Sequence, residues 1–172
     1  MPKTKSSNQS PDSSAVDRGN LTIRAALPAE APQLTQIAHD AKRYWGYPEH
    51  WIQHWQADLT ISANFISNNE VYVADQEGEV LGFYALVVRD DKAELEHMWV
   101  APAHSGRGVG KELFVHAMQR AAGENVSTVE ISSDPNAEGF YQKMGARKIG
   151  DVISEIEGEP RILPRLKIDP KS

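Results

Sequence analysis

The sequence predicts a mixed α/β fold, in which a central sheet of about seven strands is flanked by about four helices. Strand-like and helix-like segments follow one another in the order strand, two helices, three strands, helix, strand, helix, two strands, which is typical of a mixed sheet covered by helices. The three consecutive strands are joined by turns too short for a crossover, so we expect them to pair antiparallel. With 172 residues, the chain is long enough for one domain with a substantial core.

The first third of the chain predicts one strand and two helices. Residues 21–25 (LTIRA) form the strand, and Pro28 then suits the first turn of a helix, where proline's missing N–H costs nothing. The apolar residues of that helix recur at helical spacing and are Leu34, Ile37, Ala38 and Ala41. We expect the helix to end at about Arg43, before Gly46, and a second helix to follow over 48–59.

The middle of the chain predicts three strands and a helix. The strands run over 71–75, 79–89 and 92–100 and are separated by short turns. A glycine-rich segment then opens a helix that ends at Gly123. The wide apolar stripe of this helix consists of Val109, Leu113, Phe114, Ala117, Met118 and Ala121.

The last part predicts a strand, a helix and two further strands. Residues 126–133 form the strand, and Asp134 caps a helix that ends at Gly145. The final strands run over 147–155 and 160–168.

The composition is that of an ordinary globular protein and excludes several kinds of site. The chain has no cysteine, which rules out disulfides, thiolate metal sites and a cysteine nucleophile. Its formal net charge of −6 argues against a nucleic-acid partner, because such proteins usually carry a basic excess. No apolar stretch reaches the roughly 18 residues of a membrane span, and the N-terminus lacks the apolar core of a signal peptide. We therefore expect a cytoplasmic protein with no membrane partner.

The first residues differ in composition from the rest of the chain. Residues 1–19 are rich in serine, proline and charge, and hold too little apolar surface to order themselves. We expect a flexible N-terminal tail over 1–19 and a single domain over 20–172.

Residues 104–113, HSGRGVGKEL, place three glycines at the start of a helix. Such a segment is typical of an anion site, because the first N–H groups of a helix lack intrahelical partners and glycine lets an anion approach them. The spacing excludes two known phosphate loops. A Walker loop has Ser or Thr after Gly-Lys, where this chain has Glu112, and a dinucleotide loop has its third glycine one residue later than Gly110. The alternative is a flexible turn without a ligand.

Two segments, 94–113 (ELEHMWVAPAHSGRGVGKEL) and 134–150 (DPNAEGFYQKMGARKIG), resemble the GNAT superfamily of N-acetyltransferases. The first is similar to the family's acetyl-CoA motif, Arg/Gln-x-x-Gly-x-Gly/Ala, and the second to its Asn…Phe-Tyr…Gly segment. The resemblance covers about residues 21–168. It implies a GNAT-like fold with a splayed, mixed, mostly antiparallel sheet, acetyl-CoA as the co-substrate and no metal.

The resemblance also implies which residues hold acetyl-CoA. Ser105 stands where the family has Arg or Gln, which removes one donor toward the pyrophosphate, and Arg107 partly substitutes for it. The backbone of residues 98–100 would face the pantetheine as an added strand would. The implied acetyl-CoA-binding residues are Met98, Trp99, Val100, Ser105, Gly106, Arg107, Gly108, Val109, Gly110, Lys111 and Asn136.

The catalytic candidates are one tyrosine and several glutamates. Tyr141 matches the tyrosine that serves this family as the general acid toward the departing CoA sulfur; the other interpretation is a half-buried tyrosine packed beside Phe140. For the base, Glu94 falls where some family members carry a catalytic glutamate, Glu96 lies nearer the acetyl-CoA segment, and Glu130 is a third candidate. A chain of water molecules to bulk solvent is the alternative to a side-chain base.

The alternation of side chains along the strand over 92–100 predicts which of these groups share one face of the sheet. On an ideal strand, one face carries Glu94, Glu96, Met98 and Val100, and the other carries Leu95, His97 and Trp99. The family commonly has a bulge in this strand, which would break that parity.

The acceptor groove of this family is lined by the first two helices and the last strands. We expect Tyr44 and Trp45 to contact the acceptor, because aromatic ring faces attract cationic amines. His50 and His54 have the spacing of metal ligands on a helix, but no third ligand is evident nearby, so we expect no metal site.

These observations together predict an N-acetyltransferase that moves an acetyl group from acetyl-CoA to a primary amine of a small molecule or protein, by direct attack in a ternary complex. A non-catalytic acyl-CoA-binding or sensor module and a toxin-like acetyltransferase of aminoacyl-tRNA are the alternatives. Dimers are common in the family, which makes a homodimer an expectation.

Overall fold

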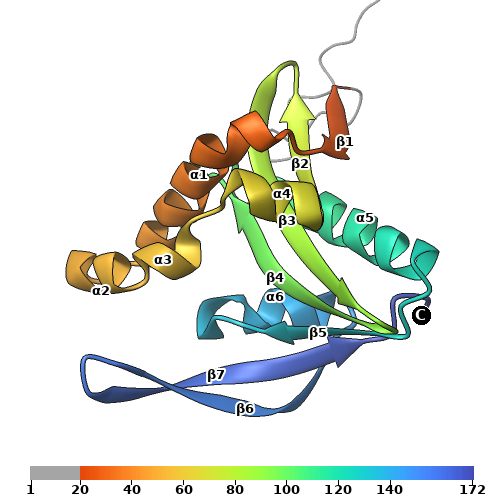
Figure 1. The fold of residues 1–172 in the computed structure, drawn as a ribbon. Coiled ribbons are helices and arrows are strands. Elements are labelled where there is room, and N and C mark those ends of the chain that lie inside the picture. The colour runs from red at the N-terminus through yellow and green to blue at the C-terminus, as the bar shows by residue number, and fades with distance from the viewer. Residues whose placement is uncertain (1–19) are drawn as a thin grey trace, which may run out of the picture.

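The computed structural model describes residues 20–172, so the tail expected over 1–19 lies outside the described residues. One sheet runs in the order β1-β2-β3-β4-β5-β7-β6, and its neighbours are antiparallel except for the parallel pair of β4 and β5 (Figure 1). The strands are β1 (Leu21–Ala25), β2 (Glu70–Gln76), β3 (Glu79–Arg89), β4 (Lys92–Val100), β5 (Thr128–Ser132), β6 (Arg147–Ile156) and β7 (Glu159–Ile168). The predicted seven strands, their succession along the chain and the mixed sheet are confirmed.

The helices depart from the prediction in the first third of the chain. The α-helices are α1 (Ala31–Tyr44), α2 (Glu49–His54), α3 (Gln56–Leu59), α4 (Ala63–Asn68), α5 (Val109–Gly123) and α6 (Glu138–Lys143), and the short 3-10 turns are η2 (Pro28–Glu30), η3 (Pro102–His104) and η4 (Pro135–Ala137). The helix expected over 48–59 is broken at Trp55, whose ring packs edge-on against Tyr47 and Trp51. Helix α4 was not expected, although Ser62 caps it by accepting a hydrogen bond from the Phe65 N–H. None of the helices within residues 20–172 has the length and apolar character needed to cross a bilayer.

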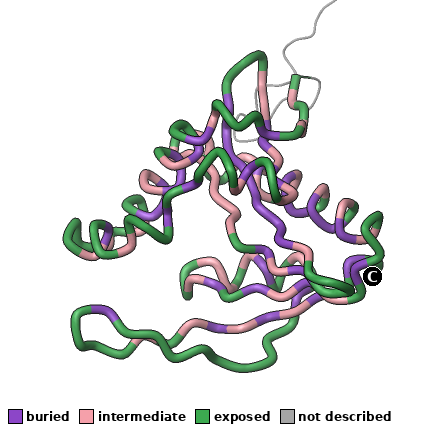
Figure 2. The backbone as a smooth tube through the Cα atoms, viewed as in Figure 1, coloured by how far each residue is buried: buried purple, intermediate pink, exposed green. Residues whose placement is uncertain are grey.

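Helices pack on both faces of the sheet, and each face has its own apolar cluster. The apolar stripe of α5 is buried against β3 and β4 together with Tyr141 of α6. On the opposite face, α1 buries Leu34 and Ala38 against β2 and β3. Figure 2 shows the buried residues gathered along the middle strands and the inner sides of these helices. Because each large side chain removed from water contributes about 1.5–3 kcal/mol, the two clusters fix α1 and α5 relative to the sheet.

The sheet divides between β4 and β5. These strands pair only over Lys92–Glu94 and Thr128–Glu130 within the described chain, and Figure 1 shows them separating beyond that point. Opposite β3, the register of β4 shifts so that Glu96 is an extra residue, which is a β-bulge. The bulge replaces the ideal alternation. Leu95, Met98 and Val100 now pack with the α5 cluster, whereas His97 lies against Phe65 and Phe83 on the α1 side and Trp99 joins the α1-side cluster.

Candidate active site

A cleft of about 450 Å³ opens at the end of β4, where the sheet divides. Four parts of the chain form it: the end of α1, the end of β4, the glycine-rich loop with the start of α5, and the segment of η4 and α6. The residues that line it are Ala41, Tyr44, Trp45, Met98, Trp99, Val100, Pro102, His104, Ser105, Gly106, Gly108, Gly110, Lys111, Asn136, Ala137, Phe140 and Tyr141. Nine of the eleven residues expected to bind acetyl-CoA are among them, and Arg107 and Val109 are not.

The glycine-rich loop needs glycine at two positions for its backbone. Gly106 and Gly108 have φ values of +76° and +87°, a region that a side chain disfavours. Gly108 is also the N-cap of α5, and its carbonyl accepts the hydrogen bond of the Glu112 N–H at 3.1 Å. The N–H groups of the first turn, residues 109–111, therefore have no intrahelical acceptor and carry the positive end of the helix dipole.

Two buried nitrogen atoms of this loop and its approach have no hydrogen-bond partner within residues 20–172. They are Nδ1 of His104 and Nε of Arg107. The Nε–H of Arg107 is a donor, and a buried donor without an acceptor is costly, so an anionic group at the loop would satisfy it. His104 Nε2 faces Glu79 Oε2 at 3.1 Å, so in the neutral ring its Nδ1 is an acceptor. Val109 is buried in the core and is not among the residues that line the cleft. The loop therefore has the donor chemistry that a diphosphate requires.

Tyr141 reaches the cleft from α6, on the wall opposite α1. Its side chain is 7% exposed and packs against Phe114 and Phe140. Burial, with a smaller contribution from the negative charge of Asp134, raises the pKa of Tyr141 well above its usual value, so the phenol stays protonated. Its hydroxyl makes no hydrogen bond to another residue of the described chain. The proton is thus available to a ligand in the cleft.

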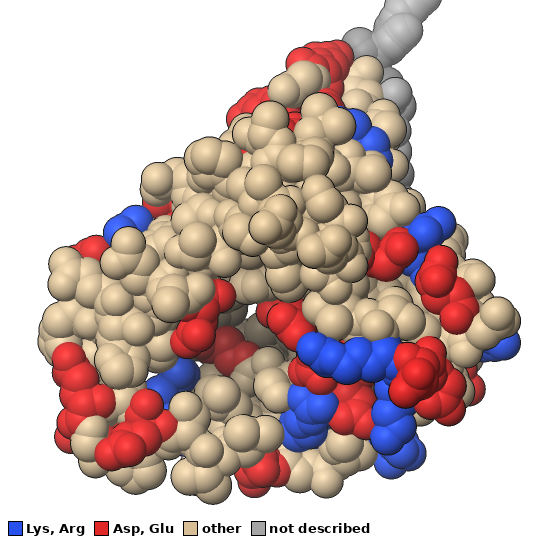
Figure 3. Space-filling view, in the orientation of Figure 1, with Lys and Arg blue, Asp and Glu red and all other residues tan. Residues whose placement is uncertain are grey.

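The glutamates expected as bases lie outside this cleft. Glu94 and Glu96 line a second groove of about 540 Å³, which also holds Asp58 and His97. Glu94 is bound by Arg165, whose Nη1 and Nη2 donate to its two carboxylate oxygens at 2.7 and 2.9 Å. Figure 3 shows a hollow in this face of the molecule with acidic side chains at its rim. Because Met98 lines the cleft and its neighbour His97 lines the groove, the two openings meet the same stretch of β4.

His97 is neutral over the physiological range. Its ring is largely buried, and this burial lowers the pKa of His97 to about 4. Its Nδ1 accepts a hydrogen bond from the indole Nε1–H of Trp99 at 3.1 Å. In the neutral ring the proton therefore sits on Nε2, which makes this histidine a donor toward the groove.

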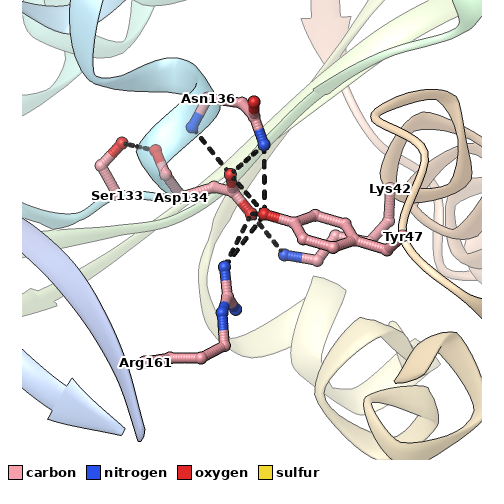
Figure 4. Close-up of polar contacts among 6 residues, drawn as sticks. All are labelled: Lys42, Tyr47, Ser133, Asp134, Asn136 and Arg161. Atoms are coloured by element: carbon pink, nitrogen blue, oxygen red, sulfur yellow. Dashed lines mark hydrogen bonds and ion pairs between the residues drawn. The ribbon is translucent and has the colours of Figure 1, made fainter. Parts of the chain in front are cut away.

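A cluster of charged and polar residues beside the cleft did not emerge from the sequence pattern. In Figure 4, Lys42 and Tyr47 approach the carboxylate of Asp134 from one side and Arg161 from another. The Lys42 Nζ donates to Asp134 Oδ2 at 2.7 Å, and the Tyr47 hydroxyl donates to the same oxygen at 3.0 Å and accepts from Arg161 Nη2 at 3.0 Å. Asn136 donates to Asp134 Oδ1 through its N–H at 2.8 Å and its Nδ2 at 2.9 Å. One feature of the sequence could have pointed to this cluster. Lys42 follows Ala38 by four residues, which places a lysine on the apolar face of α1.

Aromatic rings surround the ammonium group of Lys42. The Nζ atom lies 4.2 Å from the ring centroid of Trp55 and 5.0 Å from that of Tyr47, and the rings of Trp45 and Trp99 lie at 5.7 and 6.0 Å. Of the two residues expected to contact the acceptor, Trp45 packs against Trp99 with centroids 5.7 Å apart, and Tyr44 is 65% exposed at the cleft. The cation that these rings contact is therefore the ammonium group of Lys42, a residue of the protein itself.

The described residues offer no metal centre. No three His, Asp or Glu side chains within residues 20–172 lie close enough together to hold a metal ion. His50, one of the pair with metal-ligand spacing, instead has its Nε2 3.1 Å from Glu157 Oε1 at the tip of the β6–β7 hairpin.

The sequence of this chain is similar to those of a known protein family. The profile of the Acetyltransferase (GNAT) family matches residues 32–146. The chain is 26% identical over 136 residues to the 5-NmdU N-acetyltransferase of Pseudomonas phage PaMx11, covering 77% of this chain and 91% of the relative. It is also 26% identical over 124 residues to the peptidyl-lysine N-acetyltransferase YiaC of Escherichia coli strain K12, covering 72% of this chain and 81% of the relative.

Solved structures share the same fold at low sequence identity. A GCN5-related N-acetyltransferase from Rhodopseudomonas palustris superposes with a TM-score of 0.71 at 20% identity, over 86% of this chain and 94% of that one. The PaiA N-acetyltransferase of Thermoplasma acidophilum, solved in complex with coenzyme A, gives 0.69 at 17% identity, over 87% and 98%. With the family profile covering more than half of its length, the chain belongs to the GNAT family of acetyltransferases and is an acyltransferase.

Proposed function

We propose that this protein transfers an acetyl group from acetyl-CoA to a primary amine of a small molecule or protein. One observation carries the proposal: the same cleft joins the N-terminus of α5, which has the donors of an anion site, to the protonated phenol of Tyr141. The PaiA structure, which contains coenzyme A and has the same fold, supports acetyl-CoA as the donor.

The glycine-rich loop would hold the diphosphate of acetyl-CoA. The first-turn N–H groups of α5 would donate to it, and Lys111, which lines the cleft, would add positive charge. Arg107 does not line the cleft, and its contribution of positive charge stays a prediction. The small side chain of Ser105 lines the cleft, so this site depends on backbone donors more than on a long side chain at that position. Asn136 and the β4 residues Met98, Trp99 and Val100 would flank the arm that carries the thioester.

The chemistry needs a neutral amine, a stabilised oxyanion and a proton for the leaving thiolate. The amine nitrogen attacks the thioester carbon, the carbon–sulfur bond breaks, and Tyr141 gives its proton to the sulfur. The proton released by the amine passes to solvent in this proposal, and solvent returns a proton to the Tyr141 phenolate after each transfer. Glu94 and Glu96 as its acceptor stay predictions: both line the groove on the other side of β4, and the carboxylate of Glu94 is bound by Arg165.

The acceptor is proposed to approach from that groove. His97 at its floor and Met98 in the cleft are consecutive residues on opposite faces of β4, so an amine in the groove and a thioester in the cleft would meet at this strand. This arrangement supports direct attack in a ternary complex. The two curated relatives are named for different acceptors, 5-NmdU and peptidyl-lysine, and both classes belong in a test panel.

The test is a measurement of CoA thiol release with acetyl-CoA and a panel of amines, which includes small primary amines and lysine peptides. We expect amine-dependent thiol release with at least one acceptor, and transfer of the acetyl group to that acceptor by mass spectrometry. Tight binding of acetyl-CoA without turnover on any amine would contradict the proposal and favour a non-catalytic acyl-CoA-binding module.

A further inference from the structure

The two walls of the cleft belong to parts of the chain that the sheet does not join. One wall is the end of α1, with Ala41 and Trp45, and the other is the segment of η4 and α6, with Asn136 and Tyr141. The β4–β5 ladder ends at the pair of Glu94 and Glu130, before the cleft begins. Another contact must therefore set the distance between the walls.

Lys42 and Asp134 provide a direct link across this gap. They are 92 positions apart, on α1 and at the N-cap of η4, and their Nζ and Oδ2 atoms are 2.7 Å apart. Their side chains are only 10% and 7% exposed, so water screens this pair little. Each of the two charges has lost most of its hydration, and Lys42 compensates Asp134 at 2.7 Å, whereas Arg161 Nη2 lies 3.8 Å from the same oxygen.

The carboxylate of Asp134 connects the ion pair to residues of the cleft. Its Oδ1 accepts both the N–H and the Nδ2–H of Asn136, a cleft residue, and so fixes the first turn of η4. Helix α6, which begins at Glu138 directly after η4, carries Tyr141. A displacement of Asp134 would therefore move both Asn136 and the phenol relative to α1.

We propose that Lys42 is a positioning residue for acetyl transfer, which holds Asn136 and Tyr141 at the working distance from the α1 wall through its ion pair with Asp134. The inference rests on the proposed function, since it assigns the spacing of that same cleft. Lys42 itself does not line the cleft, which separates its role from that of a group that touches the ligand. Tyr47 and Arg161 support the pair: Arg161 donates to the Tyr47 hydroxyl, Tyr47 donates to Asp134, and Arg161 Nη2 lies 3.8 Å from Asp134 Oδ2.

The experiment compares Lys42→Met, Lys42→Arg, Asp134→Asn and the double variant Lys42→Met/Asp134→Asn. Asn can still accept from the η4 N–H, so Asp134→Asn removes the charge while keeping a cap. Arg43→Met is the matched control, because Arg43 is the next residue of α1 and its side chain is 41% exposed. For each variant we would measure CoA binding by calorimetry, kcat and KM in thiol release, and thermal unfolding.

We expect Lys42→Met to weaken CoA binding and lower kcat by at least tenfold each at a temperature where it remains folded. Lys42→Arg should recover most of the loss, and the double variant should lose less than the sum of the two single effects, because both single variants break the same contact. Arg43→Met should match the wild type. If Lys42→Met is folded and keeps wild-type CoA affinity and kcat, or if the two single effects simply add, the proposal is wrong.

The outcomes separate this inference from the proposed function. Wild-type protein that does not bind CoA would overturn both. Wild-type protein that binds CoA and turns over, with Lys42→Met doing the same, would overturn the positioning role alone. Should Lys42→Met fail to fold, Lys42→Arg and Asp134→Asn still decide: equal CoA affinity and kcat in Asp134→Asn and the wild type contradicts the proposal.

Discussion

Arg165 of β7 donates to both carboxylate oxygens of Glu94 on β4, at 2.7 Å from Nη1 and 2.9 Å from Nη2. The same guanidinium group donates to Ser132 and Glu130 of β5, the strand that lies between the other two. Glu94 and Glu130 are directly paired in the parallel ladder, so Arg165 neutralises two like charges where the sheet divides. These hydrogen bonds and charges raise the pKa of Arg165 further above its usual value.

The variant Glu94→Gln tests whether this contact is structural. We expect the free energy of unfolding to fall by about 1 kcal/mol, less than the roughly 1.5–3 kcal/mol of a buried charged hydrogen bond, because the pair is partly exposed. Calorimetry should show a melting temperature lower by about 2–4 °C. Glu96→Gln is the control, since its contact with Arg89 is 3.7 Å long and exposed, and its melting temperature should hardly change. A hundredfold loss of turnover in Glu94→Gln at an unchanged melting temperature would instead identify Glu94 as the proton acceptor.

The variant Tyr141→Phe tests the proposed general acid. Only the hydroxyl is lost, and the ring contacts with Phe114 and Phe140 remain, so folding and CoA affinity should be preserved. We expect kcat to fall by about 10²–10⁴-fold. Tyr72→Phe, a tyrosine of β2 outside the cleft, is the control and should keep the wild-type rate. Wild-type turnover in Tyr141→Phe would rule out the general-acid role.

The variant Gly108→Ala tests the backbone of the glycine-rich loop. Alanine at a φ of +87° costs about 1–2 kcal/mol, and the loop would shift to relieve this strain. We expect the KM for acetyl-CoA to rise severalfold and the melting temperature to fall by about 2–4 °C for each kcal/mol. Gly123→Ala at the other end of α5 should be neutral or stabilising, because that glycine has no positive φ and no neighbour within 4 Å of an added Cβ. An unchanged KM in Gly108→Ala would show that the loop conformation does not matter for binding.

His97 predicts a specific dependence of stability on pH. Its pKa is about 4 in the folded protein and 6.5 when unfolded, so between these values the unfolded chain binds more protons. The free energy of unfolding should therefore fall as the pH is lowered from about 6.5 to 4, by at most on the order of 3 kcal/mol. His97→Gln removes the titrating group and should flatten this part of the profile. The same slope in both proteins between pH 6.5 and 5 would contradict the assignment.

The sequence predicted the sheet well because each strand has a local signature. The runs that became β2 and β3 are rich in apolar residues, and short turns separate β2, β3 and β4. Helix α5 has a wide apolar stripe, and Gly123 stands at its end. The break of the second helix at Trp55 has no such signature, since it follows from the packing of its ring against Tyr47 and Trp51. Tertiary contacts overrode the local helical preference there.

The sequence led to the residues of the cleft where they lie in one contiguous motif, but not to the Lys42–Asp134 pair, which is assembled in space. The loop of residues 105–111 and Tyr141 each lie in a short recognisable segment, and the structure brings them to one cleft. Lys42 and Asp134 are 92 positions apart, and no periodicity connects them. The position of Glu96 could not be derived from alternation either, because the bulge that displaces it depends on the pairing of β4 with β3.

The most direct test of the proposed function is a crystal structure of the protein with acetyl-CoA. We expect the diphosphate within hydrogen-bond distance of the N–H groups at the start of α5, and the thioester sulfur next to the hydroxyl of Tyr141. Acetyl-CoA bound away from the N-terminus of α5, or with its sulfur beyond reach of Tyr141, would contradict the account.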